Sequence, residues 1–264
     1  MIATTILAHL STSLQLDPKQ NLKRSHMADG EMLMTPSEVL PSLHRLGATS
    51  EDQVAFLRYP AHDAAHSAQQ PISSHSDYGS ITVLFSEMLG LQVFLDGKWL
   101  YVKPMAGHAV VNCGDALSLF TNGLIPSIVH RVASQAERCS TEARYSLGYF
   151  CRPSSNIYLK PLQGRLIPPS ENVRDGNEDE NYNSRDWVMR RITSRLTERY
   201  SGESDWAKTT GTDDKVLNWR GSRMTYVGDC EHLCSCGDCL CLVYEQLNLA
   251  FRNLDIELSI SNIY

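Results

Sequence analysis

Two histidines and an aspartate near the middle of the chain have the residue types and spacing of a metal-binding set. His75 and Asp77 form a His-x-Asp pair, and His130 follows 53 positions after Asp77. This order is typical of a facial site in which two histidines and one carboxylate bind ferrous iron. Three protein ligands leave octahedral positions open for a cosubstrate and dioxygen, whereas a closed four-ligand site only stabilises a fold. The pattern therefore indicates metal-based chemistry.

Each part of this set also has a simpler interpretation. A His-x-Asp pair alone is usually a surface turn, and His130, which follows two apolar residues, could be a hydrogen-bonded core histidine. We favour the metal site because His75 and Asp77, two apart on one strand, would project to the same side. His130 would then come from a neighbouring strand.

Arg144 and Ser146 form a second candidate site, one strand beyond the last candidate ligand. Residues two apart on a strand share a face, so a guanidinium and a hydroxyl could together bind one carboxylate. The alternative is an ordinary salt bridge at the rim of the sheet. The position of the pair predicts an anionic cosubstrate.

The elements that would position these residues are mostly short strands separated by turn signals, which is typical of a closed or sandwiched antiparallel barrel of the jelly-roll class. Asp96-Gly97 is a strong hairpin signal. A barrel mouth is a natural ligand pocket. The expected segments are Val54–Tyr59, Ser80–Phe85, Leu91–Leu95, Trp99–Val102, Ala109–Asn112, Leu117–Phe120, Ile128–Val132 and Arg144–Phe150.

Helices are expected on either side of this region. Thr5–Leu16 has apolar residues at helical spacing, and Ser184 is a plausible N-cap for a helix to Tyr200 that packs outside the barrel. We divide the chain into a helical and loop N-terminal segment (1–50), a β domain (51–162), an acidic loop with a C-terminal helix (163–212) and a cysteine-rich tail (213–264).

Composition excludes some classes of partner. The chain has 264 residues, and 24 basic residues are outnumbered by 30 acidic ones, so nucleic acid is not the expected partner. No apolar run is long enough to span a bilayer, and the first residues lack a basic region typical of secretory signals. We expect a cytoplasmic protein with a small-molecule substrate; the oligomeric state is not predicted.

Six blocks of sequence along the chain form a recognisable set. The blocks are His75–Leu84, Gly90–Val93, Val111–Asp115, Thr121–Gly123, Val129–Val132 and Arg144–Ser146. In this order they resemble the iron(II)/2-oxoglutarate-dependent dioxygenases of the isopenicillin N synthase-like group. The resemblance covers about residues 54–162, and 187–212 look like the C-terminal part of fungal members used in secondary metabolism.

The resemblance implies a mainly β fold with flanking helices, the double-stranded β-helix (jelly-roll, cupin-like). His75, Asp77 and His130 would bind Fe(II). The far carboxylate of 2-oxoglutarate would meet Arg144 and Ser146. With O2, the implied reaction couples decarboxylation of 2-oxoglutarate to oxidation of an unactivated C–H bond, giving hydroxylation, desaturation or ring modification of a small organic metabolite.

Other residues have weaker assignments. Tyr59 matches a family tyrosine that hydrogen-bonds the cosubstrate, with a strand-end tyrosine as the alternative. Family members often have Asn where this chain has Leu57. Leu84, Phe94, Phe150 and the acidic loop are candidates for the pocket wall.

Two features depart from the family. We expect the N-terminal region that normally packs on the barrel to be lacking, which could impair activity. The tail has five cysteines, enough for a zinc site, although an unstructured extension is the favoured interpretation. Two further hypotheses stay open: a truncated, non-catalytic binding protein, and an oxidase that does not use 2-oxoglutarate. The tail cysteines are Cys230, Cys234, Cys236, Cys239 and Cys241.

Overall fold

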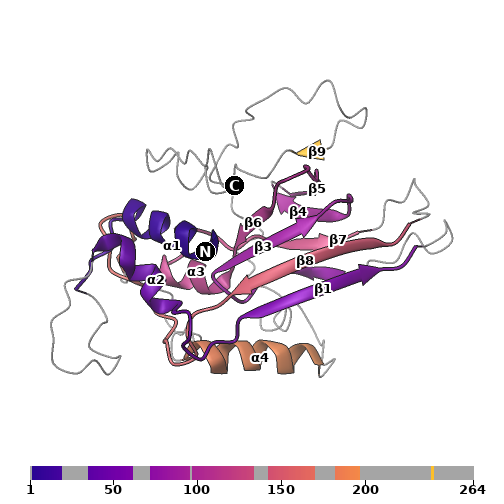
Figure 1. Cartoon of the computed structure of the whole chain (residues 1–264). Helices are drawn as coiled ribbons and strands as arrows, with labels where there is room; N and C mark the ends of the chain where they lie inside the picture. The colour runs from indigo at the N-terminus through magenta and orange to yellow at the C-terminus, as the bar shows by residue number, and fades with distance from the viewer. Residues whose placement is uncertain are drawn as a thin grey trace.

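The computed structural model describes residues 2–19, 35–61, 72–95, 97–133, 142–169, 182–196 and 239–240. Within these ranges the strands form two sheets (Figure 1), with orders β1-β8-β3-β6 and β2-β7-β4-β5-β9. The first sheet consists of β1 (Gln53–Tyr59), β8 (Arg144–Cys151), β3 (Ile81–Ser86) and β6 (Val110–Cys113). The second consists of β2 (Ile72–His75), β7 (His130–Val132), β4 (Leu91–Leu95), β5 (Lys98–Val102) and β9 (Cys239–Leu240).

Neighbouring strands are antiparallel except for β5 and β9, which are parallel. The predicted hairpin is confirmed, because β4 and β5 pair with Leu95 opposite Lys98. Asp96 itself lies outside the described residues. The mainly β architecture with flanking helices is therefore the one that the strand rhythm predicts.

One predicted strand is wrong. Leu117–Phe120 belongs to helix α3 (Asp115–Phe120). A short apolar run can form either a buried strand or one turn of buried helix, and periodicity does not separate the two. Leu117 and Phe120 are both fully buried, as the apolar pattern requires.

Within the described ranges, the helices contribute to the larger of two apolar cores. This core joins buried side chains of α1 (Ile2–Ser13), α2 (Val39–Leu43), α3 and α4 (Ser184–Leu196) to the four-stranded sheet. The short 3-10 helix η2 (Pro36–Glu38) precedes α2. Leu7, Leu10 and Leu14 are almost completely buried, which confirms the amphipathic pattern predicted for the first helix.

Helix α4 packs on this core through Trp187 and Val188, which are 2% and 1% exposed. Its predicted N-cap is wrong by one residue. The Asn183 side chain accepts a hydrogen bond from the Asp186 N–H at 2.9 Å, while the buried Ser184 hydroxyl donates to the Pro153 carbonyl at 2.9 Å. Asn183 therefore caps the helix, and Ser184 connects it to the segment that follows β8.

The second core consists of Leu91, Val93, Val102 and Ile128, from the five-stranded sheet and the segment before β7. Partly buried Leu84 and Val110 of the other sheet pack against it, so it fills the space between the sheets. The acidic stretch 175–180 and most of the cysteine-rich tail lie outside the described residues. Among the helices that are described, none is long and apolar enough to cross a membrane.

Candidate metal centre and cosubstrate site

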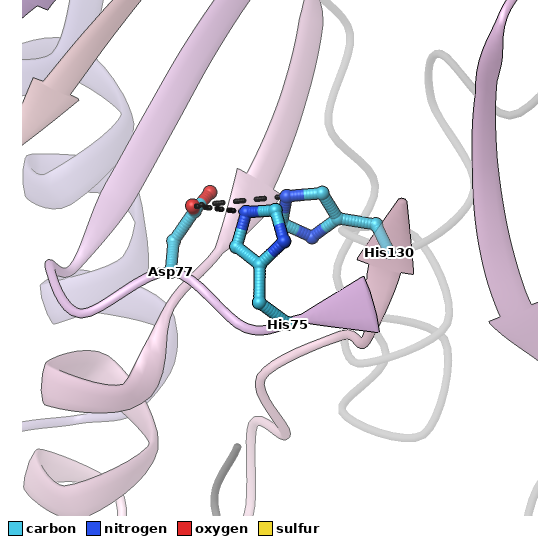
Figure 2. Close-up of side chains that lie close together, drawn as sticks. All are labelled: His75, Asp77 and His130. Atoms are coloured by element: carbon cyan, nitrogen blue, oxygen red, sulfur yellow. Dashed lines mark ion pairs between the residues drawn. The ribbon is translucent and has the colours of Figure 1, made fainter. Parts of the chain in front are cut away.

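The three candidate metal ligands point toward one another (Figure 2), in a cavity lined by residues of both sheets. His75 is the last residue of β2 and His130 the first of β7, and the two are opposite each other in the antiparallel register. The prediction that His130 comes from a neighbouring strand is confirmed. Asp77 lies two residues beyond the end of β2, so the prediction that His75 and Asp77 project from one strand is wrong. The turn after β2, rather than strand periodicity, brings the carboxylate to the histidines.

The ligand atoms converge on one point. Asp77 Oδ1 lies 3.9 Å from His75 Nε2 and 3.7 Å from His130 Nε2, and one ligand atom from each residue lies within 4.8 Å of the others. The imidazole rings are 4.4 Å apart between centroids. Two imidazole nitrogens and one carboxylate oxygen form a donor set that suits non-haem ferrous iron. The geometry and chemistry of the three side chains therefore fit that ion.

The Asp77 carboxylate is held so that one oxygen is left for a metal. Its Oδ2 accepts hydrogen bonds from Thr82 Oγ1 at 2.7 Å and from Asn112 Nδ2 at 2.8 Å. Oδ1 is the oxygen that faces the two histidines. Thr82 is on β3 and Asn112 on β6, so the four-stranded sheet orients the carboxylate while the five-stranded sheet supplies the histidines.

This environment keeps Asp77 charged. Burial alone would raise the pKa of Asp77, but the nearby His130 and His75 and the hydrogen bonds from Asn112 and Thr82 outweigh burial, so its pKa is below the ordinary value. An ionised carboxylate is the form that binds a metal.

The His130 ring is oriented by a second hydrogen bond. Its Nδ1 lies 3.1 Å from the Ile128 carbonyl oxygen, which can only accept, so Nδ1 carries the proton. In the neutral ring Nε2 then has the free lone pair, on the side that faces Asp77. Metal-binding histidines commonly donate their other ring nitrogen to a carbonyl in this way.

Arg144 and Ser146 face the same cavity as the three ligands. Both are on β8, and they are 7% and 6% exposed. The prediction that they share one side of their strand is therefore confirmed. Tyr59 is opposite Arg144 on β1, and the guanidinium carbon lies 4.8 Å from the centre of its ring.

The guanidinium of Arg144 is incompletely hydrogen-bonded. Its Nε donates to the Met88 carbonyl at 3.3 Å, but buried Nη1 has no hydrogen-bond partner among the described residues. A buried donor without an acceptor costs about 1–3 kcal/mol, so this nitrogen favours an incoming anion. A cationic side chain beside a buried hydroxyl is suited to a carboxylate.

The rest of the cavity wall is largely apolar. Leu57, Leu84 and Phe150 line it, as do side chains of the second core. Phe94, a predicted wall residue, is not among the lining residues; its ring packs 5.1 Å from that of Trp99. An apolar wall around a few polar groups is typical of a small-molecule site.

Thr82 and Asn112 are site residues that the sequence interpretation missed. Both fall inside blocks quoted for the family resemblance, His75–Leu84 and Val111–Asp115. A signal was available for Thr82, because it is two positions before Leu84, a predicted wall residue on the same expected strand. No spacing rule links Asn112 to Asp77, because they are 35 residues apart and meet only through the pairing of β3 with β6.

Comparison with known proteins places this architecture in one family. The model of the 2OG-Fe(II) oxygenase superfamily matches residues 51–153. The 2-oxoglutarate-dependent dioxygenase iboH of Amanita muscaria is 32% identical over 171 residues, 63% of this chain and 73% of that protein. The 2-oxoglutarate-dependent dioxygenase gloE of Glarea lozoyensis is 35% identical over 126 residues, 48% of this chain and 38% of that protein.

A solved structure supports the same fold. JOX2 in complex with 2OG, Fe and JA superimposes with a TM-score of 0.51 at 26% identity, covering 79% of this chain and 52% of that one. The predicted double-stranded β-helix is therefore confirmed. The chain spans less than two thirds of gloE and of JOX2, although it covers more of iboH.

The chain belongs to the 2OG-Fe(II) oxygenase superfamily, an oxidoreductase family that uses Fe(II), 2-oxoglutarate and O2. Within this superfamily its relatives include fungal 2-oxoglutarate-dependent dioxygenases. These relationships confirm the family resemblance and do not favour the hypothesis of a non-catalytic binding protein. The individual roles of the three ligands, Arg144, Ser146 and Tyr59 stay predictions.

Proposed function

We propose that this chain catalyses Fe(II)- and 2-oxoglutarate-dependent oxidation of a small organic metabolite by hydroxylation, desaturation or ring modification. His75, Asp77 and His130 would hold the iron. Arg144 and Ser146 would bind the far carboxylate of 2-oxoglutarate, with Tyr59 beside them. The fungal origin of the two relatives supports a role in secondary metabolism.

One observation carries the proposal. The convergent His-Asp-His set and a buried arginine nitrogen without an acceptor line the same cavity. A metal site alone would also fit a hydrolase or a structural ion. A metal site next to an anion-binding group fits a carboxylate cosubstrate that reaches both, as 2-oxoglutarate does in this family.

The protein residues would contribute binding, orientation and exclusion of water. Iron, 2-oxoglutarate and O2 together supply the oxidising chemistry when bound. Asp77, fixed by Thr82 and Asn112, would keep Oδ1 directed at the metal. Arg144 would set the depth of 2-oxoglutarate in the barrel, and the apolar wall would limit water beside the reacting C–H bond.

The test is succinate formation from 2-oxoglutarate by the full chain, with Fe(II) and O2. We expect formation to require Fe(II) and to disappear in His75→Ala. His108→Ala is the matched control, because His108 is exposed and donates to the nearby Ala106 carbonyl, so this variant should retain the rate. Full turnover by His75→Ala would refute the iron assignment. Oxidation of a substrate without 2-oxoglutarate would select the oxidase hypothesis instead.

We also propose that the protein works in the cytosol. Cys113 and Cys151 are buried free thiols, and ferrous iron is retained most easily in a reducing compartment. Fractionation of the native host, with an antibody against the chain, would test this location.

A further inference from the structure

A buried ion pair joins the C-terminal helix to the region of the candidate metal centre. Arg191 is on α4 and Asp115 begins α3, and their side chains are 2% and 0% exposed. Arg191 Nη2 lies 2.5 Å from Asp115 Oδ2. Neither residue lines the active-site cavity, and Arg191 is outside the segment that the family model matches. Both charges are therefore buried without contacting any substrate.

Asp115 is hydrogen-bonded to the turn that carries Asp77. Its Oδ2, the oxygen paired with Arg191, also accepts a hydrogen bond from Ser76 Oγ at 3.1 Å. Ser76 is the residue between the two ligands of the His-x-Asp pair. Three successive main-chain N–H groups at the start of α3 donate to this same turn: Asp115 to the Asp77 carbonyl at 2.8 Å, Gly114 to the Ser80 carbonyl at 3.0 Å and Ala116 to the Gly79 carbonyl at 3.1 Å.

The approach of α3 to this turn leaves no spare room. A Cβ on Gly114 would lie 2.4 Å from the Gly79 carbonyl oxygen and 2.8 Å from the Asp77 carbonyl oxygen. Both distances are shorter than real atom contacts, so the backbone of α3 packs directly against the backbone of the turn. A shift of α3 would therefore displace the backbone of Asp77. The turn takes its position from α3.

Helix α4 also contacts the same turn directly. The Arg191 guanidinium carbon lies 5.2 Å from the centre of the Tyr78 ring and 4.8 Å from that of Trp187. The Trp187 indole N–H donates to the Tyr78 carbonyl at 3.4 Å. Tyr78 directly follows Asp77, so α4 contacts the turn next to the proposed carboxylate ligand and, through Asp115, on the preceding side at Ser76.

We propose that Arg191 is a positioning residue for the iron site. By pairing with Asp115 it fixes the His75-Ser76-Asp77 turn, and α4 thereby forms part of the metal centre. This inference rests on the proposed function, since it requires that the turn binds a metal. Removing one partner of a buried ion pair leaves an uncompensated charge that the surroundings must rearrange to solvate. The group that moves is Asp115, and the turn moves with it.

The experiment is titration of Co(II), a spectroscopic substitute for Fe(II), into the metal-free full chain. The visible absorption of bound Co(II) gives both the Kd and the coordination geometry. We expect Arg191→Met to raise the Kd about 10- to 100-fold, the range usual for residues that orient metal ligands, and to alter the Co(II) spectrum. Arg191→Lys, which keeps the charge, should recover part of the affinity. Arg190→Met is the matched control, because Arg190 is the neighbouring residue of α4 and stacks 5.0 Å from the Tyr182 ring.

The outcomes separate positioning from mere stabilisation. An unchanged Co(II) Kd and spectrum in Arg191→Met, even with a lower Tm, would overturn the inference. If that variant does not fold, the double variant Arg191→Met with Asp115→Asn removes both charges of the pair. Weak Co(II) binding by the folded double variant supports positioning, and wild-type affinity overturns it. Failure of the unaltered chain to bind Co(II) would instead refute the metal site of the proposed function, and the inference with it.

Discussion

Replacing Arg144 with methionine should change the stability of the empty protein little but weaken the binding of 2-oxoglutarate strongly. In the empty protein the change removes a long hydrogen bond to Met88 and a contact with the Tyr59 ring, together worth about 2 kcal/mol. It also removes the buried Nη1, which has no hydrogen-bond partner among the described residues and costs about 1–3 kcal/mol. The two effects nearly cancel. We expect the free energy of unfolding to change by no more than about 1 kcal/mol.

The cost should appear when 2-oxoglutarate binds. Loss of one partner from a buried, hydrogen-bonded charge pair costs about 2–5 kcal/mol, so the Kd for 2-oxoglutarate should rise about 30- to 4,000-fold. Burial lowers the pKa of the Arg144 guanidinium, but an arginine stays charged near neutral pH, so the loss should not depend on pH there.

Two measurements on each variant test this reasoning. Denaturant unfolding of the metal-free protein gives stability, and calorimetric titration of 2-oxoglutarate into the Mn(II)-loaded protein gives affinity. Arg58→Met is the control, because Arg58 is an exposed arginine on β1, of the same sheet, and hydrogen-bonds Tyr145. A loss of stability above about 3 kcal/mol with unchanged 2-oxoglutarate affinity would show that Arg144 is a structural residue and that the clamp assignment is wrong.

Three further predictions concern other parts of the site and its support. Thr82→Val removes the 2.7 Å hydrogen bond to the proposed carboxylate ligand and should weaken Co(II) binding about 10-fold with the fold intact; unchanged affinity would contradict this role. Gly90→Ala would place a Cβ 3.0 Å from Arg144 Nε, so 2-oxoglutarate titration should show weaker binding, whereas Gly107→Ala, also at positive φ but with no atom of the described structure within 4 Å, should not. His44 is partly buried, and the loss of solvation lowers its pKa to about 4 from 6.5. The unfolded chain therefore takes up the proton first, and stability should fall as pH drops from about 6.5 to about 4. Unfolding measured across that range should show a shallower fall in His44→Gln, and an identical pH profile would exclude this contribution.

The alternation of side chains between the two faces of a strand predicted part of the site correctly. Arg144 and Ser146 face one cavity because alternate residues of a strand share a face, and β8 is regular over its whole length. The same argument failed for His75 and Asp77, because β2 ends at His75. The His-x-Asp motif predicted the metal site, but the two side chains do not project from one strand as strand alternation suggested.

Contacts between residues that are far apart in the sequence could not be predicted from the sequence. Arg191 and Asp115 are 76 residues apart in the sequence. No sequence motif pairs an arginine in the position of α4 with this carboxylate. Leu117–Phe120 was misassigned because a short, mostly apolar segment suits a strand or a helical turn. Only the packing of α3 against the turn that carries Asp77 decides between them. Pairing in space, rather than local preference, determines these features.

The division of the ligands between two sheets has a mechanical consequence. The histidines belong to the five-stranded sheet, while the hydrogen bonds that hold the carboxylate come from the four-stranded one. An ion bound by the two histidines and the carboxylate would cross-link the two sheets of the barrel. Part of the binding free energy would then resist separation of the layers, adding about 2.7 kcal/mol of stability at a metal concentration 100 times the Kd. Loss of the ion would remove this cross-link, and only the contacts of the protein itself would then hold β2 and β7 against the opposite sheet.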